Sequence, residues 1–333
     1  MRIAVLGSGG WGTALAMLLV ENGHEVTLWS YFPEESRQLR TTLENPLLPG
    51  VTLPSELNYT SDLSCVQDCG IVVMATPSFG VRSTAEKLRG MLRPDQILVS
   101  VSKGIEKGTS LRMTQVIREA TGDVCPVVAL SGPSHAEEVA RGVPTAVVSA
   151  CEDRSAAERV QDVFLNPRFR VYSSRDTVGV ELGAALKNVM ALCAGCCTGM
   201  HCGDNTKAML MTRGLAEMAR LGVAMGGRRE TFAGLAGMGD LIVTCTSMNS
   251  RNNRAGILIG QGVPVKEAIE RIGAVVEGYF AVDSAREMAR RAGVEMPITQ
   301  AAYQVLYEGR DPHSVLDELM RREKKHESEE TWV

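Results

Sequence analysis

A glycine-rich turn near the N-terminus constrains the fold more than any other feature of the sequence. Residues 7–12 read GSGGWG, follow a short apolar run at residues 3–6 and lead into helical spacing at residues 11–22. A second β-branched run at residues 25–29 completes a strand–helix–strand unit. A G-x-G-x-x-G turn in this setting is typical of the first βαβ unit of a doubly wound sheet that binds a dinucleotide.

Three glycines of this turn have a physical reason to be there. Gly7 permits the tight turn, Gly9 lets the backbone approach a pyrophosphate, and Gly12 lets the helix pack closely on the strand. The helix that starts here directs its first N–H groups and the positive end of its dipole at the pyrophosphate. The alternative is a glycine-rich turn with a purely structural role.

The end of the second run indicates which dinucleotide would bind. An NAD site usually carries Asp or Glu there, on the ribose hydroxyls. This chain reads WSYF at residues 29–32, and its first carboxylate is Glu34. Nothing at this end would repel a 2′-phosphate, and Arg37 is a possible but more distant partner for one. We therefore expect NADP or NAD as the cofactor, with NADP or the use of both favoured.

The first half of the chain continues this alternation of strands and helices. Helical spacing recurs at residues 81–91 and 111–120, between β-branched runs at residues 70–75, 96–101, 127–130, 145–150 and 169–172. Near-continuous apolar strands that alternate with helices predict a mostly parallel sheet covered on both faces. We expect a doubly wound α/β Rossmann domain over residues 1–176.

The second half has a different character. Its spacing is helical, at residues 178–198, 206–224, 254–260, 265–271, 281–291, 299–307 and 312–322, and it contains almost no convincing strand. We therefore expect an all-α domain over residues 177–322, followed by a charged, flexible tail over residues 323–333. The two domains should pack against each other and leave a cleft between them.

Composition argues against several classes of protein. The 333 residues are 44% hydrophobic and 22% charged, and the net charge is −4, without a long Lys/Arg block. Nucleic acid is therefore not an expected partner. The first apolar run is too short for a signal sequence and far short of the roughly 20 residues of a membrane span. We expect a cytoplasmic protein without a membrane span.

Nine cysteines are spread along the chain, with no Cys-dense module, and an odd number cannot all pair. A zinc site is one interpretation of the four near His201, which are Cys193, Cys196, Cys197 and Cys202. However, the chain has no second matched pair of ligands. The first three also lie on an apolar helix, where free cysteine behaves as a small hydrophobic residue. We expect a reduced protein with no metal.

Two lysines are candidates for chemistry. Lys103 follows the run at residues 96–101, and ligands of open α/β sheets bind at the carboxyl ends of strands. Lys187 lies in an apolar helix with small residues one turn away, which leaves room for a small molecule, and Asn188 could hold its ammonium. Burial would lower the lysine pKa towards the range for proton exchange with a carbonyl or alcohol. The alternatives are a solvated lysine at 103 and one that extends to solvent at 187.

Other polar residues could complete a site. Asp240 stands among three glycines and could orient Lys187, and Thr244 could add a hydroxyl. Arg251 is suited to hold a phosphate through paired N–H donors, with Asn252 supplying more. The alternatives are an aspartate that caps the following helix and a solvated charged loop.

The sequence also contains the segments GSGGWGTALA, VSKGIE, SGPSHAEEVA, ELGAALKNVMAL and GLAGMGDLIVTCTSMNSRNNR, in this order, between residues 1 and 310. In order and spacing they resemble NAD(P)-dependent glycerol-3-phosphate dehydrogenase. The resemblance implies a Rossmann domain and a helical domain, usually in a homodimer. It implies an oxidoreductase that interconverts sn-glycerol 3-phosphate and dihydroxyacetone phosphate with NAD(P), and supplies glycerol 3-phosphate for glycerophospholipid synthesis.

The resemblance also implies roles for individual residues. Lys187 matches the proton donor and acceptor, with Asp240 and Lys103 beside it as catalytic candidates. The expected substrate site consists of Lys103, Gly132, Ser134, Lys187, Asn188, Asp240, Thr244, Ser250, Arg251 and Asn252. Of these, Asn188 and Thr244 are the two suggested above from the residues themselves, and Arg251 and Asn252 would bind the phosphate. The expected cofactor contacts are Gly7, Gly9, Gly10, Trp11, Gly12, Tyr31, Lys103, Ala136, Arg251, Val275 and Glu277.

Departures and rival functions remain. Many family members carry Ser or Ala in place of Gly10, and a basic residue where this chain has Ser30 and Tyr31, which leaves the NADP preference open.

A different two-domain dehydrogenase, for a β-hydroxy acid or an acyl-CoA, would lack the Arg251 constellation. A non-catalytic NAD(P)-sensing protein would need the turn but not Lys187, Asp240 and Arg251 together.

Overall fold

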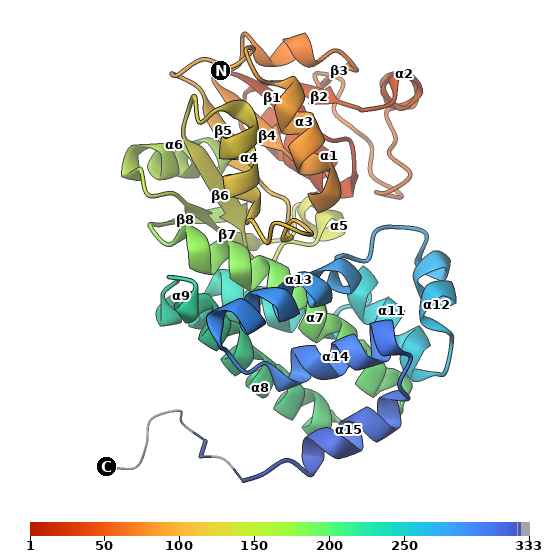
Figure 1. Cartoon of the computed structure of the whole chain (residues 1–333). Coiled ribbons are helices and arrows are strands. Elements are labelled where there is room, and N and C mark those ends of the chain that lie inside the picture. Colours follow the sequence, from red (N-terminus) through yellow and green to blue (C-terminus); the bar gives the residue numbers. More distant parts are fainter. Residues whose placement is uncertain (325, 328–333) are drawn as a thin grey trace.

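The computed structural model describes residues 1–324, 326 and 327; of the predicted tail, residues 325 and 328–333 lie outside the described part. A sheet with its covering helices forms the upper half of the molecule in Figure 1, and a group of helices forms the lower half. The sheet ends with β8 at Ser174 and the helical part begins with α7 at Thr177. The domain boundary predicted at residue 176 falls in this connection and stays a prediction.

Eight strands form one sheet in the order β3-β2-β1-β4-β5-β6-β7-β8. Their bounds are β1 (Arg2–Leu6), β2 (Glu25–Trp29), β3 (Asn58–Thr60), β4 (Ile71–Met74), β5 (Ile97–Ser100), β6 (Val127–Ser131), β7 (Thr145–Ala150) and β8 (Phe169–Ser174). Every neighbouring pair is parallel except β6 and β7, which are antiparallel. The predicted doubly wound, mostly parallel sheet is confirmed.

Helices cover both faces of this sheet. They are α1 (Gly10–Glu21), α2 (Pro33–Thr42), α3 (Val81–Lys87), α4 (Met113–Thr121), α5 (Ala136–Val139) and α6 (Arg154–Phe164), with short 3-10 turns η1 (Leu63–Val66) and η2 (Ser78–Gly80). Successive side chains of a strand point to opposite faces. In β1, Ile3 and Val5 join the core beneath α1 and α6, whereas Ala4 and Leu6 join the core beneath α3 and α4.

The helical part is built around α7 (Figure 1). Its elements are α7 (Thr177–Gly199), α8 (Asp204–Ala224), α9 (Arg229–Ala233), the π-helix η3 (Leu235–Gly239), α10 (Asp240–Thr246), α11 (Arg251–Gly260), α12 (Val265–Ile272), α13 (Glu277–Ala292), α14 (Pro297–Glu308) and α15 (Pro312–Met320). Glycine lets α7 and α11 cross in backbone contact, since a Cβ on Gly256 would lie 2.0 Å from the Leu192 carbonyl oxygen. The predicted all-α character of this part is confirmed over the described residues.

Within the described residues, α7 is the one helix long and apolar enough to cross a membrane. However, 94% of its apolar window is buried inside the protein. A helix that is hydrophobic on every side can be buried by neighbouring helices as well as by lipid. Here α8, α10, α11 and α13 surround α7, so its hydrophobicity is explained by its central position.

Some elements differ from the prediction. The spacing did not predict α2, because PEESRQLRTT offers a single large apolar side chain, Leu39, to the core. It also did not predict the three-residue edge strand β3 or α6, which Asp153 caps at its start. The helix predicted to begin at residue 281 begins at Glu277, because Gly278 obscures the first turn in the sequence.

Two carboxylates tie the helical part to the sheet domain. Glu181 of α7 is buried and accepts hydrogen bonds from the Thr114 amide (2.7 Å) and hydroxyl (2.6 Å) at the start of α4, and it pairs with Arg112. Glu277, the first residue of α13, accepts a 2.6 Å hydrogen bond from the Ser78 hydroxyl in η2. These contacts fix α7 and α13 against the carboxyl edge of the sheet.

Candidate functional site

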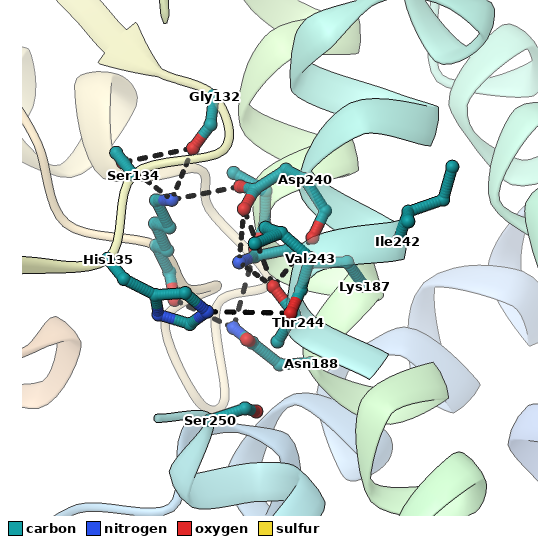
Figure 2. Close-up of polar contacts among 12 residues, drawn as sticks. Gly132, Ser134, His135, Lys187, Asn188, Asp240, Ile242, Val243, Thr244 and Ser250 are labelled. Carbon is teal, nitrogen blue, oxygen red and sulfur yellow. Dashed lines mark hydrogen bonds and ion pairs between the residues drawn. The ribbon is translucent and has the colours of Figure 1, made fainter. Parts of the chain in front are cut away.

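Two lysine ammonium groups share one buried carboxylate where the sheet meets the helices. Lys187 Nζ lies 2.6 Å from Asp240 Oδ1, and Lys103 Nζ lies 2.9 Å from Asp240 Oδ2. The Asp240 side chain is 1% exposed, that of Lys187 6% and that of Lys103 18%. The three residues come from α10, α7 and the loop after β5, and the structure brings these predicted site residues together. Figure 2 shows Asp240 and Lys187 side by side.

The Lys187 ammonium is held by oxygen atoms and surrounded by core. It donates hydrogen bonds to Asp240 and, at 2.6 Å, to the Thr244 hydroxyl. Burial lowers the pKa of Lys187, the Asp240 carboxylate opposes this and the charge of Lys103 adds to it, so that the pKa lies at about 8. A lysine of this pKa can give up or take a proton near neutral pH. The alternative of a side chain that extends to solvent is excluded by its burial.

Asp240 owes its position to the start of α10. It is the first residue of this helix, and the π-helix η3 runs directly into it. Thr244, one turn later, donates its hydroxyl hydrogen to the Asp240 carbonyl oxygen at 2.6 Å, which fixes the hydroxyl oxygen towards Lys187. The N-cap of α10 is Gly239, so the capping role considered for Asp240 is wrong, and its carboxylate is free to pair with both lysines.

Lys103 is held from the sheet side as well. Its Nζ donates to the Gly132 carbonyl oxygen at 2.9 Å and lies 3.4 Å from Ser134 Oγ. Ser134 in turn donates to the same Gly132 carbonyl at 3.0 Å. The turn after β6 therefore meets the loop after β5 at the carboxyl edge of the sheet, as predicted, and Lys103 is not a free surface lysine.

His135 is a member of this cluster that the sequence did not single out. Its Nε2 lies 3.4 Å from the Val243 carbonyl oxygen, so it links the sheet domain to α10 (Figure 2). Burial, followed by the charge of Lys187, lowers the pKa of His135. The one signal in the sequence was its place directly after Ser134, at the end of a strand.

Two asparagines differ from their predicted contacts. Asn188, predicted to hold the Lys187 ammonium, instead approaches the Lys103 carbonyl oxygen (3.5 Å) because it lies one residue further round α7. Asn252 donates to Asn188 Oδ1 at 3.0 Å and accepts from the Gly278 amide at 2.8 Å. Its side-chain amide therefore joins α7, α11 and α13, and is largely engaged rather than free for a phosphate.

The N-terminus of α11 carries the predicted anion-binding residues. Ser250 is the N-cap, and its hydroxyl accepts a 3.2 Å hydrogen bond from the Asn253 amide, so this hydroxyl has a structural role. Arg251 is the first helical residue and is exposed. It lies close enough to Glu277 to oppose the rise in pKa that burial gives that carboxyl. A guanidinium at a helix N-terminus is suited to bind an anion.

The glycine-rich turn has the predicted close packing. A Cβ on Gly12 would lie 2.0 Å from the Gly7 carbonyl oxygen, so only glycine lets α1 pack on the end of β1. Gly9 is the N-cap of α1, and a Cβ built on Gly9 would have no neighbouring heavy atom within 4 Å. Gly10 faces Ala136, whose Cβ lies 3.7 Å from the place of a Cβ on Gly10. The open end of α1 is thus formed by backbone alone.

The other predicted cofactor contacts lie around this turn or across from it. The indole N–H of Trp11 is buried without a hydrogen-bond partner in the described residues. Tyr31 follows the end of β2 and is 60% exposed. Val275 lies just before α13, and Glu277, which begins that helix, faces the sheet domain through its hydrogen bond with Ser78.

The cysteines form no disulfide bonds with each other. All nine are free thiols, and six of them are buried. Burial raises the pKa of the Cys196 thiol to about 12 and that of Cys193 well above its usual value, so these thiols stay protonated. Among the described residues, no group of three or more His, Cys, Asp or Glu side chains is placed to hold a metal ion.

Comparisons with known proteins give matches to one family along nearly the whole chain. Residues 2–157 match the family model of the NAD-dependent glycerol-3-phosphate dehydrogenase N-terminus, and residues 176–317 match the model of its C-terminus. Proteins named glycerol-3-phosphate dehydrogenase (NAD(P)+) from Desulfitobacterium hafniense and Moorella thermoacetica are 51% and 53% identical, over 99% and 98% of this chain and 94% and 98% of theirs.

A solved structure gives the same result. The crystal structure of glycerol-3-phosphate dehydrogenase from Coxiella burnetii has a TM-score of 0.92 and 36% identity, and the match covers 96% of this chain and 99% of that one. The structure from Saccharomyces cerevisiae matches with a TM-score of 0.82 and 28% identity over 95% and 98% of the two chains. The chain therefore belongs to the NAD-dependent glycerol-3-phosphate dehydrogenases, a family of oxidoreductases that use NAD(P).

Proposed function

We propose that this protein interconverts sn-glycerol 3-phosphate and dihydroxyacetone phosphate, with Lys187 as the proton donor and acceptor. The observation that carries the proposal is the buried Lys187–Asp240–Lys103 cluster at the carboxyl edge of the sheet. Family membership supplies the reaction class, and the cluster supplies the group that the reaction needs. We further propose a cytoplasmic homodimer that supplies glycerol 3-phosphate for glycerophospholipid synthesis.

The residues around the glycine-rich turn fit a dinucleotide. No side chain caps the N-terminus of α1, its first turn carries no acidic residue, and the space beyond Gly9 is open. The first N–H groups of a helix have no partner within the helix and attract an anion such as a pyrophosphate. The nicotinamide, when bound, supplies or accepts the hydride. Glu277 and Val275 would face it from the helical side.

The protein's own groups manage the proton and the substrate charge. In the reducing direction, protonated Lys187 gives its proton to the ketone oxygen as the alcohol forms, and in the oxidising direction neutral Lys187 takes it back. Asp240 holds both ammonium groups in place, so the charge that develops on oxygen lies beside two cations. Thr244 fixes the direction of the Lys187 ammonium.

We expect replacement of Arg251 to affect substrate binding more than turnover. Arg251 is exposed at the start of α11, where a guanidinium and helix N–H groups can hold a phosphate together. The variant Arg251→Ala should raise KM for dihydroxyacetone phosphate by about 10- to 100-fold, the worth of a charge-assisted hydrogen bond. Steady-state kinetics check this, with Arg254→Ala, an exposed arginine of the same helix, as control. An unchanged KM would move the phosphate site elsewhere.

The pH dependence should follow the lowered pKa of Lys187. Reduction needs the protonated ammonium, so kcat/KM should be level up to about pH 8 and then fall about tenfold per pH unit. Oxidation needs the neutral amine, so its rate should rise up to about pH 8 and then level off. Initial rates in both directions across this range check the prediction. Profiles without a break between about pH 7 and 9 would contradict it.

One assay separates this function from its rivals. Oxidation of NADH and of NADPH is followed with dihydroxyacetone phosphate, with unphosphorylated dihydroxyacetone, and with a β-keto acid. We expect turnover with the phosphate ester and little with the other two, since Arg251 and α11 recognise the phosphate. Turnover only with the keto acid would favour a β-hydroxy acid dehydrogenase, and no turnover at all would favour a sensing role.

A further inference from the structure

A lysine from another part of the sheet domain lies beside the segment that follows β2. Tyr31 lies two residues after β2 and is 60% exposed. Lys87 is the last residue of α3, the helix that follows β4, and its Nζ lies 4.8 Å from the centroid of the Tyr31 ring. An ammonium at this distance from an aromatic ring is attracted by the ring face. The fold therefore places one cation beside Tyr31, just beyond the end of the second strand.

This is the place at which a dinucleotide site distinguishes NAD from NADP. A carboxylate after the second strand binds the ribose 2′-hydroxyl of NAD, whereas a nearby cation accommodates the 2′-phosphate of NADP. Residues 29–32 offer no carboxylate. The Ser30 hydroxyl donates a 2.6 Å hydrogen bond to Ser8 Oγ in the glycine-rich turn, so it holds β2 against the turn.

Two charged groups of the helix that follows β2 are paired with each other. Glu34, the first carboxylate after β2, lies in the first turn of α2 and pairs with Arg37 of the same helix. The ion pair offsets the charge of Glu34, which would otherwise repel a phosphate, and it engages the Arg37 guanidinium. Lys87 has no such partner: in the described part of the chain, its ammonium contacts the Tyr31 ring and no carboxylate.

We propose that Lys87 is the cation that binds the 2′-phosphate of NADP(H), with the Tyr31 ring holding its ammonium in place. A phosphate monoester carries nearly two negative charges near neutral pH, and an ammonium over a ring keeps its N–H donors for it. The proposal rests on the proposed function, because it assigns the adenosine end of the same cofactor site. Lys87 thus determines specificity and takes no part in the transfer of hydride or proton.

The test compares the two cofactors in one set of variants. Lys87→Ala should raise KM for NADPH relative to KM for NADH about tenfold, the lower end of the worth of a charge-assisted hydrogen bond because the site is exposed. Lys87→Glu should raise this ratio further, whereas Lys87→Arg should keep the ratio close to that of the unaltered protein. Lys266→Ala removes an exposed lysine of α12 in the helical part and serves as control.

A binding measurement separates this proposal from the proposed reaction. Titration calorimetry with adenosine 2′,5′-bisphosphate and with 5′-AMP uses the unaltered protein and Lys87→Ala. We expect the bisphosphate to bind more tightly than AMP to the unaltered protein, and Lys87→Ala to remove most of that difference. An equal loss of affinity for both ligands, or no loss of affinity for either, would overturn the assignment of Lys87. Absence of turnover with either cofactor would overturn the reaction while leaving this binding result readable.

Discussion

Replacement of Lys187 by methionine should lower kcat for dihydroxyacetone phosphate reduction by about 100- to 10,000-fold, the usual contribution of a positioned general acid. Methionine fills a similar volume but has no proton to give. The ketone oxygen would then have to take its proton from water.

The loss should fall on chemistry and not on cofactor binding. The glycine-rich turn and α1 lie in the sheet domain and keep their structure in Lys187→Met, so we expect fluorescence titration to give an NADH affinity within about twofold of normal. Lys207→Ala, which removes a partly exposed lysine paired with Asp204 on α8, is the matched control. Near-normal turnover in Lys187→Met would exclude Lys187 as the proton donor.

Asp240→Asn should damage both activity and stability. This change leaves two ammonium groups beside each other without their shared carboxylate, in a place where Asp240 is 1% exposed. Removal of one partner of a buried ion pair lowers the free energy of unfolding by about 3–5 kcal/mol. We therefore expect a clearly lower unfolding temperature, and a fall in kcat at neutral pH of about 100-fold or more because Lys187 loses the group that keeps it protonated.

A pH profile separates these two effects of Asp240→Asn. Asp240 opposes the lowering of the Lys187 pKa, so its removal should move the break in the reduction profile below its normal place near about pH 8. A variant that is merely less stable would keep the break where it was. Asp95→Asn, which alters an exposed carboxylate paired with Arg93, should change neither the profile nor the unfolding temperature.

Local sequence rules predicted the parts of the fold that local physics decides. The turn at residues 7–12 is recognisable because a helix that packs on a strand end excludes a Cβ at Gly12. The apolar runs of β1 and β4 are recognisable because both faces of the sheet are buried. By contrast, α2 was not predicted, since its ten residues bury little more than Leu39 and Ser36.

The site was predictable in its members but not in its contacts. Lys187 and Asp240 stood out because charged residues in apolar, glycine-rich surroundings are unusual. The spacing of residues could not tell that Asn188 bonds to Asn252 of α11 and approaches the Lys103 carbonyl rather than Lys187, since the packing of distant helices decides this. The same holds for the contact of Lys87 with Tyr31, which joins elements on either side of β1.

The most direct test of the central claim follows the hydrogen itself. The purified protein is supplied with dihydroxyacetone phosphate and with NADH that carries deuterium in the transferable position at C4, and the product is examined by NMR and mass spectrometry. We predict sn-glycerol 3-phosphate with a single deuterium on C2 and a hydroxyl hydrogen that exchanges with water, the product of hydride transfer to carbon and proton transfer to oxygen. No such product, or a product without deuterium on C2, would contradict the account.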